Sequence, residues 1–138
     1  MTDSANRIVG LVVGAALLLL GVVGLVLTWG LSFTDPVGAL LLGIVSLNPL
    51  LGLVHLALAA ALLVATLRGR TAARLLNRVV GTAILALGIA GLFLSATPEN
   101  VFAVSGATNL LHFLAATVLL AVGIGTDASG RPGHPARD

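Results

Sequence analysis

The 138-residue chain is too apolar for an ordinary soluble domain, because 58% of its residues are hydrophobic and only 9% are charged. Soluble domains carry roughly a quarter charged residues, so lipid is the natural solvent for most of this sequence. The chain has no cysteine, which excludes disulfides, thiolate-held metals and cysteine nucleophiles. Its net charge of +2 comes without the basic stripe and aromatic readers that nucleic-acid binding requires.

Four apolar segments predict an all-α, polytopic membrane protein. After a polar start at residues 1–7, the expected spans are residues 8–28, 48–67, 79–94 and 106–124, within a transmembrane domain of residues 8–124. Their lengths are close to the roughly 20 residues that a helix needs to cross hydrocarbon. Residues 125–138 are rich in glycine, proline and arginine, which predicts a disordered tail.

A further apolar run, residues 37–45, is too short to cross a bilayer. It follows Asp35 and Pro36, a pair typical of a helix N-cap and first helical position. These features predict a short helix, about residues 37–45, lying in the outer interface.

The arginines predict the orientation of the chain. All seven fall on one side of the predicted spans and none lies in the exterior segments, so the positive-inside rule places both termini in the cytoplasm. Arg70, Arg74 and Arg78 share one helix face at spacings of four residues. We interpret them first as topogenic charges, with binding of anionic lipid head groups as the alternative.

The sequence also contains an internal duplication. An offset of 67 residues places residues 12–27 over residues 79–94 with ten identities in sixteen positions. Glycines lie in register in both copies, and small residues let neighbouring helices approach closely. The expected helix-packing glycines are Gly14, Gly21, Gly24, Gly81, Gly88 and Gly91.

The second helix of each pair aligns at an offset of 57 residues. This offset places His55 on His112, and Asn48 on Ser105, which are two good N-cap residues. The predicted fold is therefore a four-helix bundle of two duplicated helix hairpins, related by a pseudo-two-fold axis along the membrane normal. Both histidines should lie at equal depth, roughly 10 Å below the outer helix starts.

Two stretches of the sequence resemble the actinobacterial membrane family called domain of unknown function number 4383. They are residues 41–58, LLGIVSLNPLLGLVHLAL, and residues 109–115, NLLHFLA. Asn48, Pro49, His55, Asn109 and His112 match the family pattern. The sequence departs from that pattern at three positions that are usually polar, which are Leu51, Gly52 and Thr108. The resemblance implies four helices in a bacterial plasma membrane, and it implies no activity.

Histidines inside a membrane span are functional candidates, because a polar group is costly there. The simplest interpretation of His55 and His112 is structural: each neutral ring hydrogen-bonds to Asn48, Ser105, Asn109 or a carbonyl of the exterior segment. The alternative is a haem or pigment held by both histidines, as in bis-histidine cytochromes. A zinc site completed by an exterior carboxylate, Asp35 or Glu99, is a weaker alternative, so we expect no metal and no cofactor.

No catalytic motif is present, which predicts a non-enzymatic protein. Proton or substrate conduction would need a chain of polar groups through the bundle, and only scattered threonines lie below the histidines. We therefore expect an accessory or scaffold subunit in the lipid bilayer. It would pack against itself or a larger membrane complex through its glycine-rich first and third helices.

Overall fold

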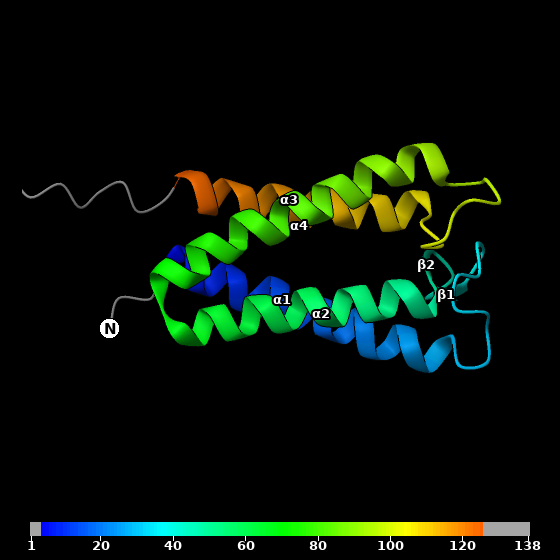
Figure 1. Ribbon diagram of the computed structural model, residues 1–138, viewed down its shortest axis with the longest axis horizontal. Helices are drawn as coiled ribbons and strands as arrows, with labels where there is room; N and C mark the ends of the chain where they lie inside the picture. Colours follow the sequence, from blue (N-terminus) through cyan, green and yellow to red (C-terminus); the bar gives the residue numbers. More distant parts are fainter. Residues whose placement is uncertain (1–3, 126–138) are drawn as a thin grey trace, which may run out of the picture.

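The computed structural model describes residues 4–125 as four long helices and one short β-hairpin (Figure 1). Each helix is long and apolar enough to cross a membrane, which confirms the predicted all-α membrane fold. Residues 1–3 and 126–138 lie outside the described residues, and so does the predicted tail apart from Gly125, which is the last residue of α4. The elements are α1 (Ala5–Leu27), β1 (Ala39–Leu41), β2 (Val45–Leu47), α2 (Pro49–Arg68), α3 (Arg70–Leu94) and α4 (Gly106–Gly125).

Local signals in the sequence define the helix starts. The Asn48 side-chain oxygen accepts a hydrogen bond from the Leu51 N–H at 2.8 Å, and Pro49 occupies the first helical turn of α2. Ser4 caps α1 in the same way, four residues before the expected transmembrane start. α3 begins at Arg70, well before residue 79, because no helix-breaking residue separates the arginine-rich stretch from the apolar one.

The helices associate as two hairpins, α1 with α2 and α3 with α4, and contacts between the hairpins are sparser. In Figure 1 the two hairpins diverge towards the end that carries β1 and β2. A central apolar cluster nevertheless joins all four helices. Its buried members are Leu17, Ala59, Leu62, Val80, Ile84, Ala116 and Leu119.

The predicted helix-packing glycines lie inside these hairpins. A Cβ atom added at Gly14 would lie 3.0 Å from the Leu63 side chain of α2, and one added at Gly81 would lie 3.0 Å from Leu120 of α4. All six glycines are buried against the partner helix of their own hairpin. The glycine faces are therefore occupied within the chain, and the expectation that they contact another protein loses its basis.

Equivalent contacts recur in the two hairpins at the offsets found in the sequence. The Arg7 Nε donates to the Thr66 carbonyl at 3.1 Å, and the Arg74 Nε donates to the Gly123 carbonyl at 3.1 Å. The two arginines are 67 residues apart and the two carbonyls are 57 residues apart. The same separations hold for the contacts described above, since Gly14 and Gly81 are 67 residues apart and Leu63 and Leu120 are 57 residues apart. The pseudo-two-fold axis itself stays a prediction.

The expected interfacial helix at residues 37–45 is wrong. The segment instead forms an antiparallel hairpin, in which Leu41 pairs with Val45. Leu42 and Gly43 both have left-handed backbone angles, φ 52° and 77°, and the Ile44 N–H donates to the Leu41 carbonyl at 3.2 Å, as in a tight hairpin turn. The predicted Asp35 cap does form, with bonds to the N–H groups of residues 37 and 38, but it starts a turn.

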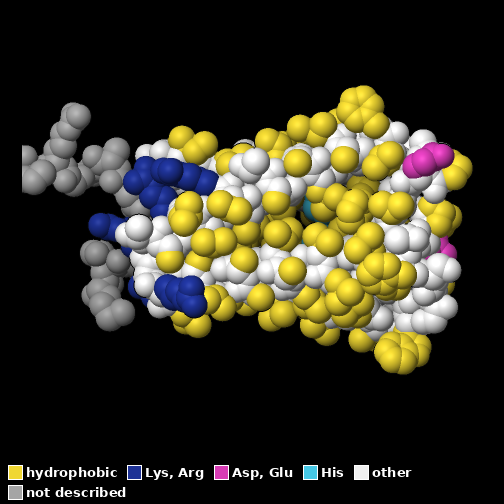
Figure 2. All heavy atoms as spheres, in the orientation of Figure 1, with side chains coloured by type: hydrophobic (Ala, Val, Ile, Leu, Met, Phe, Trp, Pro, Cys, Tyr) yellow, Lys and Arg dark blue, Asp and Glu magenta, His cyan; other side chains and the backbone are white. Residues whose placement is uncertain are grey.

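Charge separates along the long axis of the bundle. Figure 2 shows arginine at one end, acidic side chains at the other, and an apolar surface between them. Five arginines, at positions 7, 68, 70, 74 and 78, belong to the first end of the described chain. Asp35 and Glu99 belong to the exterior segments at the opposite end. The apolar middle gives the molecule the profile of a membrane-spanning bundle.

Candidate functional site

The structure brings together the two histidines that the predicted duplication aligns. His55 of α2 and His112 of α4 lie with their Nε2 atoms 3.2 Å apart, within hydrogen-bond distance. The rings meet edge to face, with centroids 5.5 Å apart and planes inclined by 70°. Only 1% and 3% of the two residues' surfaces are exposed. Each histidine follows its N-cap residue by seven positions, which places both at similar depth.

The tautomers of this pair are linked by their shared hydrogen bond. One Nε2 must carry a hydrogen and the other must offer a lone pair, and a neutral imidazole carries one hydrogen in total. The donor ring therefore has a bare Nδ1, and the acceptor ring has an Nδ1–H. Neither Nδ1 atom has a hydrogen-bond partner among residues 4–125. The pair thus presents one unused donor and one unused acceptor inside the membrane domain.

The expected partners of the histidines were wrong, because Asn48, Ser105 and Asn109 bind other groups. The Asn48 amide donates to the carbonyls of Asp35 and Val101, at 2.9 and 2.7 Å. Asn109 lies against α3, where a Cβ added at Gly91 would be 2.3 Å from its side-chain amide group.

Ser105 fastens the hairpin to the start of α4. Its Oγ accepts from the Thr108 N–H at 3.3 Å and lies 2.9 Å from the Thr108 hydroxyl. The Thr108 hydroxyl in turn donates to the Ser46 carbonyl at 3.0 Å. Asn100 completes this exterior cap, since its amide donates to the Pro36 carbonyl at 3.2 Å. Sequence reasoning missed Ser46 and Asn100, whose only signal is that such side chains favour turns and caps. It noted Thr108 only as a departure from the family pattern.

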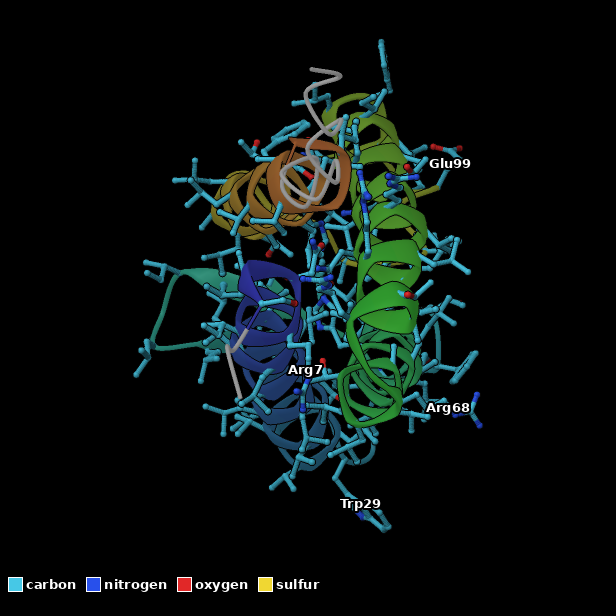
Figure 3. The ribbon with its side chains drawn as sticks, turned by 90° about the vertical axis from the view of Figure 1, so that its left-hand side faces the viewer. Arg7, Trp29, Arg68 and Glu99 are labelled. Atoms are coloured by element: carbon cyan, nitrogen blue, oxygen red, sulfur yellow. The ribbon has the colours of Figure 1, made fainter. Side chains whose placement is uncertain are left out.

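A groove with a volume of about 320 Å³ lies between α1 and α4 and reaches both histidines. Val45 of β2 lines it from the exterior side, and the hairpin lies on the α1 and α4 side of the bundle in the end view of Figure 3. Two of its wall residues, Val12 and Leu114, are themselves 62% and 56% exposed, so the groove opens sideways to the membrane. The lining is apolar apart from the two imidazoles and Thr108.

The sequence model of the family described as domain of unknown function (DUF4383) matches residues 7–125, which include both histidines and all of the four helices except the first two residues of α1. The chain belongs to this family. No curated protein and no solved structure matches it. The function of this DUF4383 protein must therefore be argued from its own geometry.

That geometry does not fit a haem between the histidines. Bis-histidine ligation places the iron and its macrocycle between the two nitrogens. Here the Nε2 atoms of His55 and His112 are in direct contact at 3.2 Å, with no space for a ring system between them. Residues 4–125 also contain no group of three histidine or acidic side chains placed to hold a metal, and Asp35 and Glu99 belong to the exterior segments.

A second buried polar contact joins α1 and α3 of this DUF4383 protein near the arginine end. The Asn77 amide donates to the backbone oxygen of Asn6 at 2.9 Å and to its side-chain oxygen at 3.0 Å. Both residues are fully buried. Sequence reasoning missed them, because the two asparagines are not equivalent under either offset. The available signal was an asparagine on the buried face of α3, four residues after Ala73 and four before Gly81.

Two of the three predicted head-group arginines are engaged with α4. Arg74 donates to the carbonyls of Gly123 and Ile124 at 3.1 and 3.4 Å, and Arg78 donates to Gly123 at 2.6 Å. Cations at a helix C-terminus satisfy its free carbonyls and favour its dipole. Arg70 is exposed, so the environment of the three arginines is not the same along this face of the helix.

Proposed function

We propose that this chain is a non-enzymatic integral membrane protein that binds a small apolar molecule taken from the bilayer. The groove between α1 and α4 supports this proposal, because it is apolar and open towards lipid. Its volume of about 320 Å³ falls in the range of small-molecule pockets, which is roughly 300–1,000 Å³. A molecule dissolved in the hydrocarbon could enter sideways without crossing either polar surface.

The distribution of reactive groups supports binding over catalysis. Within residues 4–125, the arginines and the two acids belong to opposite ends of the bundle, far from one another along the helices. The groove itself offers two imidazoles and one threonine hydroxyl, which already bonds to the Ser46 carbonyl. This set lacks the third group that usually orients a nucleophile and its base.

We further propose a bacterial plasma membrane location with both termini in the cytoplasm. The arginine end contains the first turn of α1 and the connection between α2 and α3. The opposite end contains the hairpin and the segment between α3 and α4, where no arginine occurs. The positive-inside rule favours the arginine end on the cytoplasmic side.

Photo-crosslinking tests whether the groove is occupied from the bilayer. The full chain is placed in lipid nanodiscs with an alkyl diazirine probe, and adducts are mapped by mass spectrometry. We expect adducts concentrated on the groove walls, with a severalfold loss when Ala16, a lining residue, is changed to Phe. Leu19→Phe is the control, because Leu19 is 64% exposed and does not line the groove. Uniform labelling of all four helices, unchanged in Ala16→Phe, would overturn the proposal.

The second candidate is an accessory or scaffold subunit, in a homo-oligomer or a larger membrane complex. The observation that favours it is the exposed hairpin, where Leu40, Leu42 and Ile44 are 57%, 87% and 61% exposed. Exposed apolar clusters on a surface often mark protein contacts. Native mass spectrometry from nanodiscs tests it: an oligomer that dissociates in Leu42→Ser supports this role, and a monomer with no partner recovered by crosslinking in membranes contradicts it.

A further inference from the structure

The two unpaired nitrogens of the histidine pair indicate what kind of molecule the groove takes. Both Nδ1 atoms are buried and have no partner, although an unpaired buried polar atom costs free energy. Both imidazoles line the groove. We propose, building on the function proposed above, that the ligand is an uncharged lipid-soluble molecule with a carbonyl or hydroxyl head group, of the quinone and quinol class, held by Nδ1 of the pair.

The tautomer linkage explains why one site suits both oxygen chemistries. With the Nε2 atoms of His55 and His112 sharing one hydrogen, one Nδ1 is a donor and the other is an acceptor. A carbonyl oxygen accepts from the Nδ1–H, and a hydroxyl donates to the bare Nδ1. Neither bond changes the charge of the pair.

The surroundings of the pair favour an uncharged head group. None of the described residues that line the groove is charged, and a charge inside the bilayer is costly unless it is paired. The sideways opening beside Val12 and Leu114 leaves a path for a long apolar tail to remain in the hydrocarbon. A plain lipid acyl chain would also fill the groove, but it would leave both Nδ1 atoms unpaired.

A matched set of three probes tests the head group. The full chain in nanodiscs is titrated with a long-chain quinone, with its quinol under anaerobic conditions, and with an alkylbenzene of the same chain length. We expect the quinone and quinol to bind about tenfold or more tightly than the alkylbenzene, because each supplies a partner for a buried nitrogen. The double change His55→Phe with His112→Phe should remove this preference while the alkylbenzene still binds.

The outcomes separate the two proposals. Equal binding of all three probes to the unaltered chain overturns the head-group assignment and leaves the groove as a binding site. Binding of none of them overturns both. A second measurement serves if the double variant does not fold: ¹⁵N spectra of histidine-labelled protein should show the ring nitrogens shifting with quinone and quinol and not with alkylbenzene. Unchanged ring nitrogens with bound quinone contradict the assignment.

Discussion

The side-chain amide of Asn48 donates a 2.7 Å hydrogen bond to the backbone carbonyl of Val101, which joins the start of α2 to the segment between α3 and α4. The same amide donates to the Asp35 carbonyl, and its oxygen caps α2. One fully buried side chain therefore connects both exterior segments to the bundle. Because the hairpin and Val45 form the exterior wall of the groove, this connection also shapes the candidate site.

Replacing Asn48 by Ala should destabilise the protein by about 2–4 kcal/mol. The change removes an N-cap, worth about 1 kcal/mol, and leaves two partly buried carbonyls without this donor, at about 1–3 kcal/mol for the two together. The free energy of unfolding can be measured by titrating detergent-solubilised protein with a denaturing detergent. Asn48→Asp is the matched variant, because it keeps the capping oxygen and loses the two donated bonds. A loss in Asn48→Asp close to zero would show that the two donated bonds contribute little.

Replacing Gly21 by Ala should cost about 1–3 kcal/mol through overpacking. An added Cβ would lie 2.7 Å from the Leu56 side chain and 2.9 Å from the Gly52 carbonyl, and the backbone atom cannot yield easily. Gly106→Ala is the control, because nothing lies within 4 Å of a Cβ at that position of α4. Thermal unfolding in the same micelles should separate the two variants. Equal midpoints would contradict close packing of α1 on α2.

The sequence predicted the number of spans and the similar depth of the two histidines because both depend on simple rules. The helix number follows from four apolar runs of sufficient length. The similar depth of His55 and His112 follows from their equal spacing after Asn48 and Ser105. Both features depend on local signals that occur in each half of the sequence, so they can be predicted without knowledge of tertiary packing.

The partners of the polar groups were not predictable in the same way. The apolar run at residues 37–45 has no periodicity that distinguishes a strand from a helix. The segment forms a hairpin because the chain turns back at Leu42 and Gly43, which have left-handed backbone angles. Asn6 and Asn77 meet across the two hairpins at positions that the repeat does not relate. The histidines were expected to hold the exterior segments, but Asn48 and Asn100 already satisfy those carbonyls, so the rings bond to each other.

Replacing Asn77 by Leu should lower stability only modestly, by about 0.6–1.7 kcal/mol. Hydrogen bonds between membrane helices average about 0.6 kcal/mol, because the separated helices also find partners. The two bonds to Asn6 are short and buried, which favours the upper part of that range. Leu75→Ala is the control on the exposed face of α3 and should change the free energy of unfolding little. A loss above about 3 kcal/mol would instead indicate a role for Asn77 beyond this contact.

Replacing Arg74 and replacing Arg70 should change the stability of the protein differently, and the difference should depend on the charge of the lipid. Arg74→Gln removes the bonds to Gly123 and Ile124, so its cost of about 0.3–1 kcal/mol should appear even in neutral micelles. Arg70 is exposed, and Arg70→Gln should be neutral there. If the arginines at positions 70, 74 and 78 also bind anionic head groups, anionic lipid should stabilise the unaltered chain more than Arg70→Gln, by about 1 kcal/mol. Thermal unfolding with and without phosphatidylglycerol measures this difference. An identical lipid response of the two proteins would leave Arg70 with a topogenic role alone.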